Sequence, residues 1–193
     1  MNNIAIFASG SGSNAEQIIQ HFSGGSLAQV KVILSNNPKA FVLERAKILD
    51  VPSLVFKRQQ FYETNQIVDF LKSLGINLIV LAGFMWLVPS NLLMAYQGKI
   101  VNIHPALLPA FGGKGMYGHH VHEAVIASKA RKSGITIHLV DEVYDHGQIL
   151  FQAECEVFPD DNAESLANRI HQLEHQHYPQ QIERFLRSFA HRP

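Results

Sequence analysis

The sequence predicts a single α/β domain of three layers, α/β/α, in which a mainly parallel, Rossmann-like twisted sheet ends in a C-terminal antiparallel hairpin. The length of 193 residues fits one domain, spanning 1–193. Apolar, β-rich runs alternate with segments of helix length along the chain. Several of these runs are almost unbroken in apolar character, which is typical of strands that helices cover on both faces.

The elements of the first half follow from this alternation. Between the apolar runs, hydrophobic residues recur every three or four positions, which predicts helices over residues 14–22, 40–49 and 61–75. Strand and helix thus alternate as in βαβ units, whose strands run parallel. The predicted strands are residues 4–8, 30–35, 53–56, 76–82 and 99–104.

The pattern changes after Gly134. Two apolar runs, 135–140 and 148–158, are separated only by DEVYDHG, and so short a connection joins antiparallel strands. Residues 161–185 are predicted to form a closing helix with a break near Pro179. No linker, repeat or low-complexity tract appears, which favours one domain.

Composition narrows the class of protein. Hydrophobic residues make up 47% and charged ones 17%, while Lys plus Arg and Asp plus Glu both number 16, so no overall field favours nucleic acid or a membrane surface. The single Cys155 excludes an intrachain disulfide. Neither a signal peptide nor a membrane-spanning run is expected. We therefore expect a soluble, cytoplasmic protein.

A glycine loop, SGSGSNA at residues 9–15, joins the first strand to the first helix. It matches the loose dinucleotide pattern, but the second strand ends in SNN at 35–37 where a dinucleotide site needs an acidic residue. A phosphate monoester at the helix N-terminus, held by Gly12, Ser13 and Asn14, fits better. The alternative is that Ser13 or Asn14 only caps the helix.

Polar residues at the end of the fifth strand form the second candidate site. Asn102 and His104 share one face of VNIHPALLP, and Asp145 in the hairpin turn is placed to orient the imidazole. Hydrogen bonding at a strand end is the alternative role. An amide, an imidazole and a carboxylate suit acyl transfer to an amine. Cys155 has no evident base, which favours direct transfer without a covalent intermediate.

Four motifs in order, GSGSNAE, GFMWLVP, VNIHPALLP and GITIHLVDEVYDHGQIL, resemble the phosphoribosylglycinamide formyltransferase family. The resemblance covers nearly all of the chain. It implies transfer of a formyl group from 10-formyltetrahydrofolate, the co-substrate, to glycinamide ribonucleotide in purine (IMP) synthesis. It also implies small-molecule substrates, no metal, no nucleic acid or membrane partner, and a monomer or homodimer.

The resemblance also implies roles for individual residues. Phosphate binding falls to the N-terminal half, about 1–100, and catalysis with folate binding to about 101–193. Thr136 and His138 match polar positions beside the catalytic residues. The matched site residues are Asn102, His104 and Asp145 for catalysis; Gly12, Ser13, Asn14, Pro105 and Glu174 for the ribonucleotide; and Met85, Trp86, Leu87, Val88, Val140, Asp141 and Glu142 for the folate.

The chain departs from the family pattern in two places. Trp86 and Gln59 stand where the family often has basic residues, so we expect Arg58 or Lys57 to grip the glutamate tail of the folate. The stretch AFGGKGMYGHH at 110–120 is longer and richer in glycine than the common version, and is predicted to be a mobile loop near the site.

Other functions compete with this interpretation. A formyltetrahydrofolate hydrolase shares the catalytic residues. Transfer of the formyl group to another amine acceptor is a second alternative. A nucleotide-binding module that catalyses no reaction needs only the glycine loop. A methionyl-tRNA formyltransferase needs a basic face, which a neutral chain does not favour. The clustered histidines are predicted to be structural or to line the pocket, with His120 or His122 on the phosphate side, rather than to bind metal.

Overall fold

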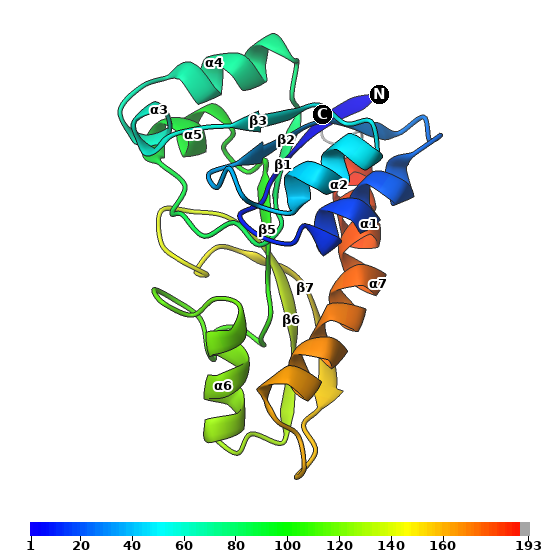
Figure 1. Cartoon of the computed structure of the whole chain (residues 1–193), viewed down its shortest axis with the longest axis vertical. Coiled ribbons are helices and arrows are strands. Elements are labelled where there is room, and N and C mark those ends of the chain that lie inside the picture. Colours follow the sequence, from blue (N-terminus) through cyan, green and yellow to red (C-terminus); the bar gives the residue numbers. More distant parts are fainter. Residues whose placement is uncertain (190–193) are drawn as a thin grey trace.

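The structure, a computed structural model, describes residues 1–189 and forms one seven-stranded sheet in the order β3-β2-β1-β4-β5-β6-β7. The first five strands are parallel, and β6 is antiparallel to β5 and β7 (Figure 1). The predicted fold class is confirmed. The strands are β1 (Asn2–Phe7), β2 (Ala28–Ser35), β3 (Ser53–Val55), β4 (Leu78–Leu81), β5 (Ile100–His104), β6 (Lys132–Leu139) and β7 (Ile149–Glu156).

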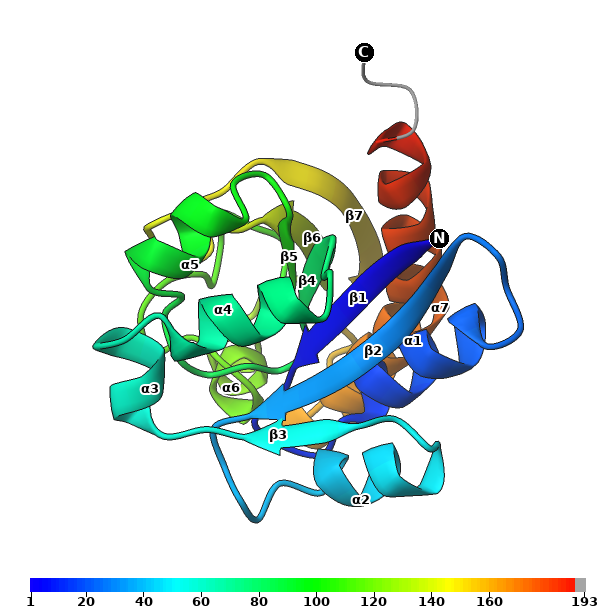
Figure 2. The same ribbon diagram turned by 90° about the horizontal axis from the view of Figure 1, so that it is seen from above.

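Helices cover both faces of the sheet (Figure 2). Successive side chains of β1 point to opposite faces of the sheet and are buried on both. Ile4 and Ile6 belong to the core beneath α1, α2 and α7, whereas Ala5 and Phe7 belong to the core beneath α3, α4 and α5. Burying each large apolar side chain stabilises the fold by about 1.5–3 kcal/mol. The helices are α1 (Ser13–Phe22), α2 (Val42–Ile48), α3 (Arg58–Tyr62), α4 (Gln66–Ser73), α5 (Ser90–Ala95), α6 (His119–Ala127) and α7 (Ala163–Phe189).

The predicted hairpin of β6 and β7 is confirmed. Its turn needs glycine at position 147, because a side-chain carbon there would lie 1.8 Å from the carbonyl oxygen of Leu139. The antiparallel pairing of β6 with β5 places His138 opposite Asn102. Residues more than 30 positions apart in the chain thus become neighbours at one end of the sheet.

The prediction of one helix over residues 61–75 is wrong, because α3 ends at Tyr62 and α4 begins at Gln66. Local polar contacts replace the helical turn between them. The Thr64 hydroxyl accepts a hydrogen bond from the backbone N–H of Gln66 at 3.2 Å, and Asn91 donates to the Thr64 carbonyl at 3.0 Å. Short polar side chains often divert the backbone in this way.

The predicted break near Pro179 is also wrong, since α7, which is 27 residues long, contains Pro179 and continues past it. Packing on both sides of the proline holds the helix: Tyr178 and Ile182 are fully buried. The Tyr178 hydroxyl lies 2.9 Å from the carbonyl oxygen of Leu81 and 3.1 Å from that of Val101. Neither α7 nor any other helix within residues 1–189 is both long and apolar enough to cross a membrane.

Candidate active site

A pocket of about 560 Å³ opens beyond the carboxyl ends of β1, β4 and β5. This is where open parallel sheets place their ligands. The glycine loop and the end of β5 line the same pocket, as do the hairpin turn and the face of α7 that carries Glu174. The two candidate sites of the sequence therefore form one continuous site. Its walls come from residues 10–14, 81–88, 102–105, 113–118 and 143–145, together with His122, His138, Val140, Asp141, His171 and Glu174.

Asn102, His104 and Asp145 meet in this pocket. The flanking Val101 and Ile103 belong to the core beneath α1 and α7. The Nδ1 atom of His104 lies 3.4 Å from Oδ2 of Asp145, and both side chains are nearly buried. Asp145 has a φ of 54°, an uncommon value for a residue other than glycine. Its place in the turn aims the carboxylate at the imidazole.

His138 links Asn102 to Asp145. Its Nδ1 donates to the carbonyl oxygen of Leu139 at 2.8 Å, and its Nε2 lies 3.1 Å from the amide nitrogen of Asn102. The same Nε2 lies 3.6 Å from Oδ1 of Asp145. His138 therefore orients the Asn102 amide, with its nitrogen toward the imidazole.

Opposing effects set the protonation of His104. Burial lowers the pKa of the imidazole, while the Asp145 carboxylate and the contact with Phe111 raise it, and the net pKa lies below the ordinary 6.5. Burial also raises the pKa of Asp145, but the neighbouring histidines His138 and His104 and the Gly113 N–H lower it overall. Near pH 7 the site thus pairs a mostly neutral imidazole with an ionised carboxylate.

The backbone of the loop before α6 touches this site directly, which sequence reasoning missed. His104 Nε2 lies 2.8 Å from the Phe111 carbonyl oxygen. The N–H of Gly113 donates to Asp145 Oδ2 at 3.0 Å. Since these contacts are made by main-chain atoms, residue identity gave little signal beyond the nearby glycines. The predicted mobility of this loop stays a prediction.

The glycine loop leaves the start of α1 open. Gly12 is the N-cap residue with a φ of 75°, and no side chain caps the helix there. The Asn14 amide instead donates to Glu174 Oε2 at 2.8 Å. The first N–H groups of α1 therefore remain available to an anion, which the helix dipole favours. This observation supports phosphate binding over capping by Ser13 or Asn14.

Glu174 is a buried acid facing the loop from α7. Its side chain is 6% exposed. Burial raises its pKa from 4.5 to about 7, against a lowering contribution from the hydrogen bond of Asn14. The carboxyl is thus divided between its two forms near neutral pH, and can donate or accept a hydrogen bond.

The opposite wall of the pocket is apolar and aromatic. It contains all four predicted residues of GFMWLVP, and Trp86 packs edge-on to Phe56 at 5.9 Å. Ser9, which sequence reasoning did not assign to this wall, accepts a hydrogen bond from the Met85 N–H at 3.0 Å. Val140 and Asp141 line the pocket, whereas Glu142 is exposed and lies outside its walls. Folate binding by these residues stays a prediction. Glu142 lies beyond the end of β6 at Leu139, in the turn of the hairpin. The alternation of side chains along a strand therefore does not decide where its side chain lies.

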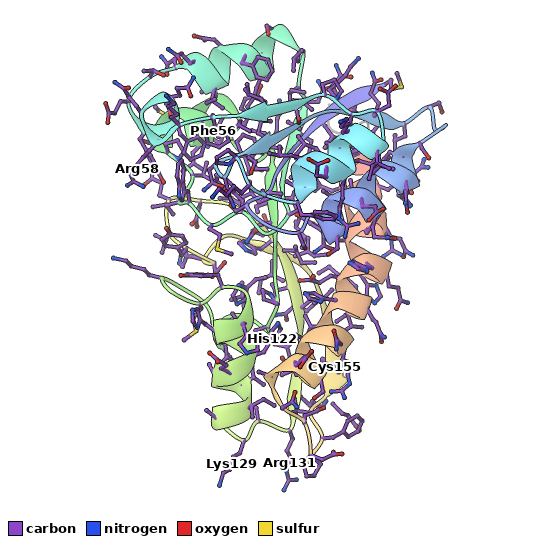
Figure 3. All side chains as sticks on the ribbon, in the orientation of Figure 1. Phe56, Arg58, His122, Lys129, Arg131 and Cys155 are labelled. Atoms are coloured by element: carbon purple, nitrogen blue, oxygen red, sulfur yellow. The ribbon has the colours of Figure 1, made fainter. Side chains whose placement is uncertain are left out.

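Arg58 lies behind this wall. Its guanidinium sits 4.7 Å from the centre of the Tyr62 ring and 5.7 Å from that of Trp86, and Figure 3 places it on the same side of the molecule as Phe56. Neither Arg58 nor Lys57 lines the pocket. A role for either in holding the folate tail stays a prediction.

The clustered histidines have separate surroundings. His119 and His120 are exposed near Glu123, whereas His122 and His171 line the pocket. Within residues 1–189 there is no group of three or more side chains of the types that bind metal, arranged to hold an ion. Of the two histidines predicted for the phosphate side, His122 is the one inside.

Comparison with known proteins agrees with this geometry. The family model for formyl transferase matches residues 2–182. The chain belongs to the formyl transferase family. The match begins at β1 and extends into α7 beyond Tyr178, so it includes every wall of the pocket.

Relatives within this family carry the name predicted from the motifs. Phosphoribosylglycinamide formyltransferase of Bacillus subtilis is 38% identical over 96% of this chain and 95% of its own. The chloroplastic protein of that name from Arabidopsis thaliana is 42% identical over 91% of this chain. The chain spans 62% of the length of this plant relative and 59% of that from Vigna unguiculata.

Solved structures of the family have the same fold. The crystal structure of phosphoribosylglycinamide formyltransferase from Bacillus halodurans superposes with a TM-score of 0.86, at 40% identity over 96% of this chain and 95% of that one. Glycinamide ribonucleotide transformylase 1 from Geobacillus kaustophilus gives 0.87 at 39% identity, with 96% and 99% covered. The predicted resemblance is confirmed.

Proposed function

We propose that this formyl transferase moves the formyl group of 10-formyltetrahydrofolate to the amine of glycinamide ribonucleotide in purine (IMP) synthesis. The observation that carries the proposal is the meeting of Asn102, His104 and Asp145 in one pocket with an open helix N-terminus. The names of the relatives support the same activity.

The proposed reaction is a direct transfer. The amine nitrogen attacks the formyl carbon, and the tetrahedral intermediate collapses by breaking the bond from that carbon to N10 of the folate. Asn102 donates a hydrogen bond to the oxygen as it gains negative charge. His104, whose protonation this charge favours, donates to the same oxygen from Nε2 in place of its contact with the Phe111 carbonyl, while Nδ1 faces Asp145. Asp145, directly or through water, takes the proton that the amine nitrogen loses and passes it to N10 as the bond from the formyl carbon to N10 breaks.

Each substrate has its own wall in this proposal. The phosphate of the ribonucleotide binds the start of α1 at Gly12, Ser13 and Asn14. Glu174 and Pro105 line the path from there to the amine, and Glu174 hydrogen-bonds the ribose. The folate binds the apolar wall formed by Met85, Trp86, Leu87, Val88, Val140 and Asp141.

The proposal places the enzyme in the cytoplasm as a monomer or homodimer with small-molecule substrates. The purified protein is incubated with 10-formyltetrahydrofolate, with and without glycinamide ribonucleotide, while absorbance reports deformylated folate and mass spectrometry reports formylated product. Release that requires the ribonucleotide is expected. Release without it would identify a hydrolase, and no release in either mixture would point to another amine acceptor or to binding without chemistry.

A further inference from the structure

His122 is a polar residue on the buried face of α6. Its neighbours on that face are Val121 and Val125, and all three are at most 3% exposed. Figure 3 places His122 on α6 in the lower half of the molecule, where α6 packs beside α7. Unlike the two valines, His122 also lines the pocket. The apolar pattern of the helix does not account for a histidine at this position.

The His122 imidazole has no hydrogen-bond partner among the residues that the structure describes, and its Nδ1 is completely buried. A buried polar group without a partner destabilises a fold, and native proteins keep few of them. The Oδ1 atom of Asn14, in the glycine loop, is likewise buried and has no hydrogen-bond partner among the described residues. Both residues belong to the walls of the one pocket. The Nε2 atom of His122 also lacks a partner among the described residues but is not fully buried, so a ligand bound in the pocket can supply a hydrogen bond to this imidazole.

His122 is uncharged at neutral pH. Burial, together with smaller contributions from the neighbouring His171, His119 and His104, lowers its pKa from 6.5 to about 4. A neutral imidazole offers one donor and one acceptor. Its natural partner is therefore a group that can also do both, such as a hydroxyl, rather than a phosphate or a carboxylate.

The position of His122 indicates which part of the acceptor carries this hydroxyl. It lies near enough to interact electrostatically with His104, where the amine reacts, and with His171, one turn before Glu174 on α7. A ribonucleotide with its phosphate at the start of α1 and its amine at His104 has its sugar between them. The sugar is thus the part that passes His122.

We propose that His122 determines specificity for a ribose by donating or accepting a hydrogen bond with one sugar hydroxyl of the phosphorylated acceptor. This inference rests on the proposed function and adds a residue to it. His122 contacts the sugar away from the reacting atoms, so its contribution is to affinity and sugar selectivity.

The test uses isothermal titration calorimetry on the full chain. Glycinamide ribonucleotide and its 2′-deoxy and 3′-deoxy analogues are titrated into the wild type and His122→Phe, which keeps a flat ring. Removal of one neutral hydrogen bond should weaken ribonucleotide binding about fivefold to tenfold. The preference over one of the two analogues should fall by the same factor, and folate affinity should not change.

Further variants separate this role from a structural one. His122→Gln retains a hydrogen-bonding group near the position of Nε2 and should restore the preference, and His122→Leu replaces the phenylalanine variant should that protein not fold. His120→Phe, on the exposed side of the same helix, should match the wild type. An unchanged preference for both analogues in the apolar variants, no rescue by glutamine, or no ribonucleotide binding to the wild type would each overturn the inference. Binding as expected without formyl transfer would instead reject the proposed function alone.

Discussion

At the scale of single residues, the neighbours of His104 decide what its imidazole can do. The side chain is 3% exposed, which disfavours its charged form, yet a carboxylate stands 3.4 Å away. Burial prevails over the carboxylate, and the pKa of the imidazole is lowered. A developing oxyanion adds a second negative charge beside the ring. The imidazole can therefore gain its proton as the reaction needs it.

Asp145→Asn should shift the pH dependence of the reaction to lower pH. The carboxylate raises the pKa of His104 against the effect of burial, so a neutral amide lets that pKa fall further. In a pH profile of kcat/KM, the limb that reports His104 moves toward acid and the maximal rate decreases. Asp160→Asn, a change of the same charge at an exposed position, should leave the profile in place. An identical limb in Asp145→Asn would remove Asp145 from this role.

Asn102→Ala should lower kcat by about 10²–10³-fold, the usual effect of removing one oxyanion donor. His138 holds this amide at 3.1 Å, so the donor is oriented before substrate arrives. Dissociation constants for both substrates should change little, because the bond is strongest in the transition state. Steady-state kinetics with equilibrium titration separate the two effects, and a wild-type kcat would contradict the assignment.

At the scale of elements, the turn from β1 into α1 brings the helix N-terminus to the pocket. Gly12 has a φ of 75°, and a side-chain carbon there would lie 2.4 Å from Cγ2 of Val42 on α2. The turn is thus packed against the next helix as well as bent. Both constraints keep the first N–H groups of α1 directed at one point.

Gly12→Ala should therefore weaken ribonucleotide binding about tenfold or more and destabilise the protein by about 1–3 kcal/mol. Folate affinity, which depends on the other wall, should be retained. Gly24→Ala is the matched control, since Gly24 has the same φ of 75° but open space around it. Calorimetric titration and denaturant unfolding distinguish the variants. Equal effects of both would mean that backbone strain, not the contact with Val42, is responsible.

Glu174→Gln should raise the melting temperature in alkaline buffer. The folded-state pKa is about 7, above the ordinary 4.5, so the folded protein holds a proton that the unfolded chain has lost. The stability from this group is complete below about pH 4.5 and is lost as pH rises through 7. The neutral amide escapes this loss, which is at most about 3 kcal/mol. Scanning calorimetry should show a difference at pH 8.5 that disappears at pH 5; a constant difference would contradict the raised pKa.

At the scale of the whole molecule, α7 contacts both the glycine loop of the pocket and the strands of the sheet. Its buried residues pack on the same face as α1, while its Glu174 reaches the glycine loop. The Tyr178 hydroxyl contacts the carbonyls of Leu81 and Val101, on β4 and β5. The helix that closes the chain thus also fixes the strands whose ends carry the site.

Tyr178→Phe should lower the free energy of unfolding by about 1–2 kcal/mol, because two buried carbonyls lose a shared donor. For a domain of this size that corresponds to a melting temperature lower by a few degrees. Tyr96→Phe provides the control, since the Tyr96 hydroxyl is buried with no hydrogen-bond partner in the described part of the chain and its removal should cost nothing. Thermal unfolding of the two variants should differ clearly. Equal melting temperatures would show that the Tyr178 contacts add no stability.

Local patterns predicted the elements whose signal lies within one segment. Unbroken apolar runs predicted the parallel strands, and a short polar connection predicted the hairpin. The errors came where contacts across the molecule prevailed: Tyr178 and Ile182 keep α7 continuous past Pro179, and Asn91 of α5 helps to hold the break at Thr64. A proline or a helical period says nothing about such distant partners.

The sequence by itself determined the fold class, the family and the residues proposed for the chemistry. Motifs such as VNIHPALLP contain side chains whose chemical types indicate the reactions that they can support. Only the tertiary structure decided the surroundings of those side chains. The antiparallel register of β5 and β6 sets His138 beside Asn102, and the loop backbone reaches His104 at Phe111. Within residues 1–189 it also left His122, on the pocket wall, without a hydrogen-bond partner. Burial and hydrogen bonding depend on residues remote in sequence, which no local pattern encodes.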